Sequence, residues 1–211
     1  MPRGTSHASA VATGQYERFG FLDRTRGRRY EYLGMPSILR PFLTGADRRS
    51  QAQSARALAS VRDNPALVSE LAALVDDRDW LVSMRALDLL EKLAFTDCAL
   101  VEPHKGVFIG PIADSDKWEN RLQVVRALPR FEWTARQRRR AVAILMRDVE
   151  HDQLFVRAWA LDGLATFAMS DAKMRTLVRR QLEKFERSRS KALAARARKI
   201  RERLKRPLRA T

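Results

Sequence analysis

The sequence predicts an all-α fold, an α-solenoid of stacked antiparallel helix pairs, from three observations. A cassette at residues 81–90 recurs 74 residues later at 155–164, with its Val, Ala-Leu, Asp and Leu in register. A related segment at 122–128 lies 41 residues after the first copy and 33 before the last. Apolar residues within each copy have helical spacing, and strand-type alternation is hard to find. A mean period of 37 residues is typical of stacked helix pairs, whose neighbours bury a shared core.

The composition restricts the class of protein further. In 211 residues, 45% are apolar and 31% charged, and proline and glycine are few, as in helical proteins. The single cysteine, Cys98, leaves no internal disulfide framework and fits a reducing compartment. No apolar run approaches the roughly 18 residues that a membrane span needs. The first residues lack the apolar stretch of a secretory signal. We therefore expect a cytoplasmic protein with no integral membrane association.

The positive charge is concentrated at one end of the chain. The whole chain has a net charge of +16, but residues 51–134 carry a net −3. Residues 172–211 carry sixteen basic and three acidic groups, a net +13. The repeat region is therefore near neutral, and the positive charge of the C-terminal end favours contact with a polyanion.

Three segments are expected. Residues 1–46 mix aromatics and arginines with glycines and prolines, and we expect a flexible, irregular basic arm with at most a short helix around 37–43. Residues 47–206 form the solenoid, with three to five repeats and a strongly basic last helix. Residues 207–211 are a tail.

The first half of the solenoid has four expected helical stretches. Residues 50–61 carry a weak apolar face, and an Asn-Pro pair separates them from the stripe of residues 67–75. The acidic run 76–79 supplies N-cap oxygens to helix 80–94. Its partner, residues 101–112, is looser because prolines and glycines interrupt it.

The second half repeats this pairing. An Asp-Ser-Asp link is expected to cap the first of these helices, and Thr134 the second. The last helix has apolar residues at heptad-like spacing and stops at Pro207. The expected helices are residues 118–130, 135–149, 153–168, one that opens at Ser170 or Asp171, and 191–206.

The repeated cassette resembles a HEAT repeat. The best match is Asp152–Leu164, where an acidic link precedes an apolar residue, Val-Arg and Ala-Leu-x-x-Leu. Asp79–Leu90 and Asn120–Leu128 are poorer copies, in which Ser83 replaces the arginine and Gln123 the valine. The resemblance covers about residues 47–205. It implies a binding scaffold that holds partners on its concave helices, although a few bacterial members are DNA glycosylases.

Catalytic and metal-binding patterns are weak. The HEAT-like alkylpurine glycosylases place an aspartate one helical turn from a tryptophan, whereas Asp162 lies three residues after Trp159, an imperfect substitute. We assign the four tryptophans mainly to packing between repeats. The three histidines have no companions at metal spacing, and no Gly-rich phosphate loop or nucleophile elbow occurs. We therefore predict no catalytic residue, metal site or small-molecule cofactor.

The candidate functional residues are basic. Cations crowd the first turns of helix 135–149, against the preference of the helix dipole, and continue along the last two helices. We expect a non-enzymatic scaffold that engages a polyanion, either a nucleic acid or an acidic protein surface. The alternatives are a HEAT-like DNA glycosylase and a purely protein-binding adaptor. The candidate partner-binding residues are Arg136, Arg138, Arg139, Arg140, Arg179, Arg180, Arg196, Arg198, Lys199, Arg203 and Lys205.

Overall fold

The computed structural model describes residues 36–45 and 47–205, and these residues form helices and connections without a strand. The predicted all-α fold is confirmed. Most of the expected arm and the tail after residue 206 lie outside the described residues. The α-helices are α1 (Arg40–Leu43), α2 (Ser54–Asp63), α3 (Val68–Ala73), α4 (Trp80–Thr96), α5 (Cys98–Val101), α6 (Trp118–Ala127), α7 (Ala135–Asp148), α8 (Leu154–Ala168), α9 (Ala172–Glu186) and α10 (Lys191–Lys205).

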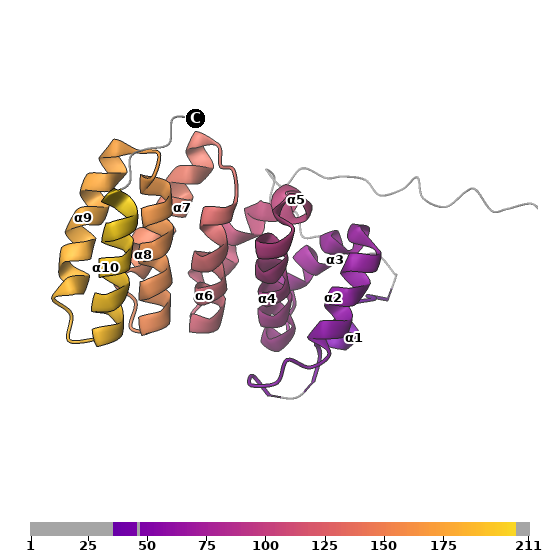
Figure 1. Cartoon of the computed structure of the whole chain (residues 1–211). Coiled ribbons are helices and arrows are strands. Elements are labelled where there is room, and N and C mark those ends of the chain that lie inside the picture. The colour runs from indigo at the N-terminus through magenta and orange to yellow at the C-terminus, as the bar shows by residue number, and fades with distance from the viewer. Residues whose placement is uncertain (1–35, 46, 206–211) are drawn as a thin grey trace, which may run out of the picture. The chain divides into compact units, whose positions relative to one another are not determined.

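Four helices define the architecture. Helices α4, α6, α8 and α10 pack against one another in chain order, and we call them the row (Figure 1). A second layer packs on them: α3 against α4, α7 against α6 and α8, and α9 against α8 and α10. This alternation is the helix-pair stacking that the repeat period predicts.

The looser partner at residues 101–112 is mainly 3₁₀ helix. Segments η4 (Glu102–Ile109) and η5 (Pro111–Asp114) take the place of a regular α-helix and pack against α6. Two prolines lack the amide donors that an α-helix needs, which favours short 3₁₀ turns here. Val107 and Phe108 are nevertheless buried, so this segment still closes the core. The shorter 3₁₀ segments are η2 (Pro65–Leu67), η3 (Leu74–Asp76) and η6 (Leu128–Arg130).

Helix starts follow the predicted caps at three of five links. The Asp79 side chain accepts a hydrogen bond from the amide of Leu81, 2.9 Å away. Thr134 and Gln137 form a reciprocal capping box at the start of α7. Asp171 caps α9. The Asp-Ser-Asp link before α6 does not cap it, because Lys117 occupies the N-cap position without a side-chain bond. Asp152, expected to open the helix of residues 153–168, does not cap α8, because Gln153 occupies the N-cap position without a side-chain bond.

Helix α8 is packed on several sides. Helices α6, α7, α9 and α10 all contact it. It is accordingly apolar around most of its circumference, as a helix buried on several sides should be. Its fully buried side chains include Val156, Ala160, Leu161 and Leu164.

Residues 36–45, which the sequence analysis assigned to the arm, are part of the packed unit. Leu39 and Leu43 are fully buried in the core. Arg85 of α4 is 1% exposed, and its guanidinium is satisfied by main chain rather than by an acid. It donates hydrogen bonds of 2.5–3.1 Å to the carbonyl oxygens of Leu43, Gly45, Asp47 and Ser50. Helix α4 therefore fixes this segment in place.

Candidate functional site

The α7 arginines divide into solvent-facing and paired side chains. Arg136 and Arg139 are exposed and form no ion pair with an acid in the described ranges. Arg138 donates to Asp171, 3.0 Å away, and to the carbonyl oxygen of Phe167 at 3.1 Å. Because Asp171 caps α9, Arg138 ties the start of α7 to the start of the next outer helix.

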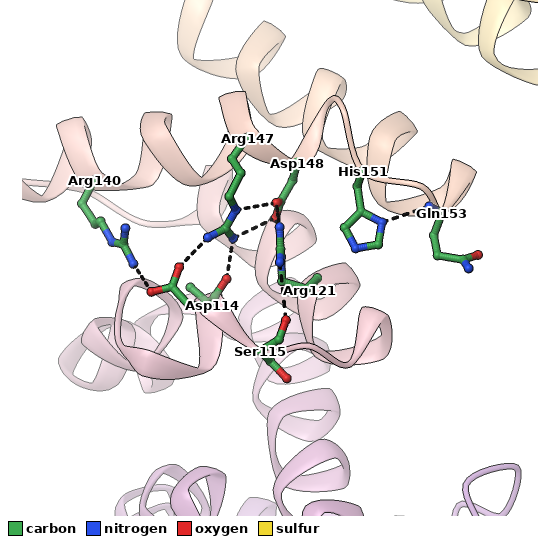
Figure 2. Close-up of polar contacts among 9 residues, drawn as sticks. Asp114, Ser115, Arg121, Arg140, Arg147, Asp148, His151 and Gln153 are labelled. Atoms are coloured by element: carbon green, nitrogen blue, oxygen red, sulfur yellow. Dashed lines mark hydrogen bonds and ion pairs between the residues drawn. The ribbon is translucent and has the colours of Figure 1, made fainter.

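Arg140 belongs to a network that joins η5, α6 and α7. Its guanidinium donates to Asp114, 2.6 Å away, and Arg147 bridges Asp114 and Asp148 (Figure 2). Arg121 of α6 donates to Asp148 from Nε at 3.1 Å, and Asp148 is fully buried. Burial alone would raise the pKa of Asp114, but the hydrogen bonds from Arg147 and Arg140 outweigh it and hold that pKa below its ordinary value. Arg140, which the sequence suggested as a partner-binding residue, is therefore engaged in a contact within the chain.

Helices α9 and α10, which we call the basic end, present most of their cations to solvent. Between residues 172 and 205 there are fourteen basic and three acidic residues. Five of these cations form ion pairs, among them Lys205, 2.6 Å from Glu202. The exposed cations without an ion pair to any acid of the described chain are Lys173, Arg179, Arg180, Arg187, Arg189, Lys191, Arg198 and Lys199.

Two of the predicted residues on α10 pair with an acid of the neighbouring row helix instead of facing solvent without a partner. Arg196 and Arg203 of α10 both pair with Asp162 of α8, the second at 2.9 Å. Arg203 also donates to the main-chain carbonyl of Asp162 at 3.2 Å. The carboxylate that the sequence singled out beside Trp159 is therefore held by two guanidinium groups.

Guanidinium groups and aromatic rings alternate across the row in what we call the stack. Arg130 lies 3.6 Å from the centroid of the Phe95 ring, and Arg126 lies 5.6 Å from the same ring. Arg126 is also 5.1 Å from the Trp159 ring, and Arg196 is 4.6 Å from it. Such contacts hold guanidinium planes in fixed orientations. The stack takes residues from all four row helices and from η6.

Glu91 of α4 lies next to Arg126, a member of the stack. Its side chain is 1% exposed and sits 3.0 Å from the guanidinium of Arg126. Neither carboxylate oxygen has a hydrogen-bond partner in the described part of the chain. Burial raises the pKa of Glu91 from its ordinary value of 4.5 to about 7, because it outweighs the opposing attraction of Arg126.

A pocket opens beside the stack, between α6, α8 and α10. It has a volume of about 280 Å³, and its charged lining consists of Arg126, Arg130, Arg203 and Asp162, with Trp159 on its wall. The Nε atoms of Arg126 and Arg203 are buried and have no hydrogen-bond partner in the described structure. The pocket therefore combines an aromatic wall with an excess of donors.

The stack and the pocket are not among the predicted sites, although the repeat register contains a signal for them. The offsets of 41 and 33 residues place Arg85, Arg126 and Trp159 at one repeat position. In the structure each of these side chains contacts an earlier part of the chain: Arg85 the segment before α2, Arg126 helix α4, and Trp159 the side chain of Arg126. Arg126 and Trp159 also contact the row helix that follows their own. Arg126 and Trp159 therefore link consecutive members of the row, whereas Arg85 links the first row helix to the segment before α2.

Other classes of site have little support. No cluster of three or more His, Cys, Asp or Glu side chains that could hold a metal ion occurs within the residues that the structure describes. None of the helices in that same part of the chain is both long and apolar enough to cross a membrane. Trp133 donates its indole N–H to the carbonyl of Leu128 at 2.8 Å, which agrees with a packing role.

Comparisons with known proteins identify the class of fold. No protein-family model matches the sequence, and no curated protein matches it. Among solved structures, an engineered protein from a structural genomics consortium is similar with a TM-score of 0.57 and 19% identity, over 79% of both chains. A designed armadillo repeat protein in complex with the peptide (KR)4 has a TM-score of 0.57 and 17% identity, over 80% of this chain and 81% of that one. At these identities the likeness shows a helical-repeat fold.

Proposed function

We propose that this chain is a cytoplasmic, non-enzymatic binding protein of the HEAT-like type, and that its basic end holds a nucleic acid. The HEAT-like assignment rests on the cassette of residues 152–164 and on the stacking of its helices in the row. Helical-repeat proteins offer extended surfaces to partners, which suits a long charged ligand.

The observation that carries the proposal is the set of eight exposed, unpaired cations within residues 172–205, six on α9 and α10 and two, Arg187 and Arg189, in the connection between them. The three acids of these helices, Glu183, Glu186 and Glu202, already lie close to Arg201 or Lys205. The surplus charge therefore has no local counterpart. Like charges so close together repel one another, and a phosphate backbone that displaces its own counterions relieves this repulsion.

The test is the salt dependence of binding to single- and double-stranded oligonucleotides. Arg179, Arg180 and Lys199 are changed together to glutamine, since all three are exposed and form no ion pair with the described chain. On duplex DNA, each lost phosphate contact should flatten the log–log salt slope by roughly 0.9, so a change of about 2 to 3 is expected.

The matched control changes Arg49, Arg62 and Arg78 to glutamine. These residues are also exposed, but they lie at the other end of the described chain, near α2 and α3. The control should alter the slope by less than about 1. If the unmodified chain binds neither DNA nor RNA at about 50 mM salt, the nucleic-acid proposal is wrong.

The purely protein-binding adaptor remains the second candidate. It is favoured by two exposed apolar residues at the start of α8, Leu154 and Phe155, which are 46% and 67% exposed. The fold likeness to a designed repeat protein solved with a peptide is compatible with it. A glycosylase would release methylated bases from alkylated DNA, and we expect no release by this chain, because Asp162 is already held by Arg196 and Arg203.

A further inference from the structure

We propose that the pocket between α6, α8 and α10 binds a phosphate monoester. This site is separate from the exposed cations of the basic end, so it goes beyond the proposed function. Four properties of the pocket point to this ligand: its charge, its unsatisfied donors, its rigidity and its size.

The charge of the pocket matches a dianion. Three guanidinium groups and one carboxylate line it, which leaves a net charge of +2. Two charged residues lie next to the lining: Arg196, which pairs with Asp162, and Glu91, which pairs with Arg126. When Glu91 is ionised, their opposite charges cancel, and the net charge of the site is unchanged. A phosphate monoester carries about −1.5 to −2 charges at neutral pH, whereas a carboxylate or a phosphodiester carries only one.

The hydrogen-bonding groups of the pocket lack acceptors. Asp162 is its only carboxylate within the described chain, and both of its oxygens are already engaged by Arg196 and Arg203. The Nε donors of Arg126 and Arg203 have no partner. Because these two Nε atoms are buried, the guanidinium group open to a ligand is that of Arg130, and a phosphate supplies three acceptor oxygens for it.

The donors are also fixed before a ligand arrives. The Phe95 and Trp159 rings hold Arg126 between them, Phe95 also holds Arg130, and Asp162 holds Arg203. Ordering these long side chains on binding therefore costs little, which favours affinity for a small ligand. At about 280 Å³, the pocket is slightly smaller than the roughly 300–1,000 Å³ of most ligand sites, so it suits one phosphorylated group.

Calorimetric titration of the full chain with inorganic phosphate, phenyl phosphate and benzoate tests the chemistry. Both phosphates should bind, and benzoate, which has one charge, should bind at least about tenfold more weakly. Arg130→Gln is the main variant, since Arg130 is exposed and its loss should leave the fold intact. Arg126→Gln is the second variant, and circular dichroism checks that both remain helical.

Each variant should weaken phenyl phosphate binding about tenfold, the loss expected for one charge-assisted hydrogen bond. The matched control is Arg140→Gln, which removes one exposed guanidinium on α7, and its affinity should stay within about twofold of the parent. Absence of phosphate binding at about 10 mM, or equal weakening in all three variants, overturns the proposal.

Two further arms identify the source of the phosphate and separate this site from the basic end. A 5′-phosphorylated oligonucleotide is compared with its 5′-hydroxyl twin. Tighter binding of the first, lost in Arg130→Gln, assigns a strand terminus, and equal binding assigns a free small phosphate ester. A double variant in which Arg179 and Arg180 are changed to glutamine should bind phenyl phosphate like the parent, since neither residue lines the pocket. If it loses phenyl phosphate binding, the pocket is not the site and the proposal fails.

Discussion

Arg157 donates a hydrogen bond from Nε to the main-chain carbonyl of Val149, 3.2 Å away and eight residues earlier. Ser83 occupies the same repeat position and donates to the carbonyl of Val75, also eight residues earlier, at 2.6 Å. The serine that departs from the HEAT-like pattern therefore does the same work as the arginine. Both side chains fasten the start of a row helix to the end of the helix before it.

The first prediction separates this contact from the core. Leu161→Asp should unfold the unit, because Leu161 is fully buried and an unpaired carboxylate there costs several kcal/mol, comparable with the whole stability of a domain. Arg157→Ala should cost about 1 to 2 kcal/mol, since it loses the bond to Val149 and the contact with the Phe185 ring. Urea denaturation followed by circular dichroism measures both. A Leu161→Asp chain that melts like the parent would refute the repeat register.

The second prediction concerns Arg85. Arg85→Met removes the guanidinium that serves four carbonyl groups of the segment before α2, and should destabilise the unit by about 3 kcal/mol or more. Arg62→Met, at an exposed position on α2, should stay within about 0.5 kcal/mol of the parent. Amide hydrogen exchange of residues 36–45 should rise in the first variant. Unchanged protection there would contradict the anchoring role of Arg85.

The third prediction follows from the raised pKa of Glu91. Its folded pKa, about 7, lies above the ordinary 4.5, so the folded state binds the extra proton between these values and stability falls as pH rises through them. The full effect is up to about 3 kcal/mol. Glu91→Gln should remove this slope, with its largest gain over the parent above pH 7. The control is Glu132→Gln at an exposed loop position, and identical pH profiles of stability for Glu91→Gln and the parent would contradict the assignment.

The fourth prediction has the opposite sign. The amide of Met174 and the side chain of Arg138 donate to Asp171 and hold its pKa below the ordinary value. Its contribution is therefore present above about pH 4 and lost as pH falls through the lower folded pKa. Asp171→Ala should cost about 1 to 2 kcal/mol at pH 7 and less near pH 2. Asp171→Asn keeps a good cap and should lose less. Thermal melts across this pH range measure the difference.

Much of the fold could be predicted from the sequence because it depends on local patterns. The caps at Asp79, Thr134 and Asp171 and the helix starts at Trp80 and Ala135 rest on side chains within a few residues of one another. The segment at 36–45 could not be placed, because its anchor, Arg85, lies about forty residues away.

The candidate site was harder to predict for the same reason. The predicted basic residues are on α7, α9 and α10, and exposed positions such as Arg179 can be read from the apolar face of one helix. The stack, in contrast, depends on how neighbouring helices are rotated about their axes. Phe95, Arg126 and Trp159 meet only when three consecutive row helices are packed, so no local pattern reveals the contact.

Arg85, Arg126 and Trp159 each contact a part of the chain that precedes their own helix, and this order bears on how the unit folds during synthesis. When one of these side chains emerges, the ribosome has already made the earlier segment that it contacts. These contacts can therefore form during synthesis, one helix pair after another, before the helices that follow have been made. Helix α10 follows the same rule, because its Arg196 and Arg203 pair with Asp162 of the earlier helix α8.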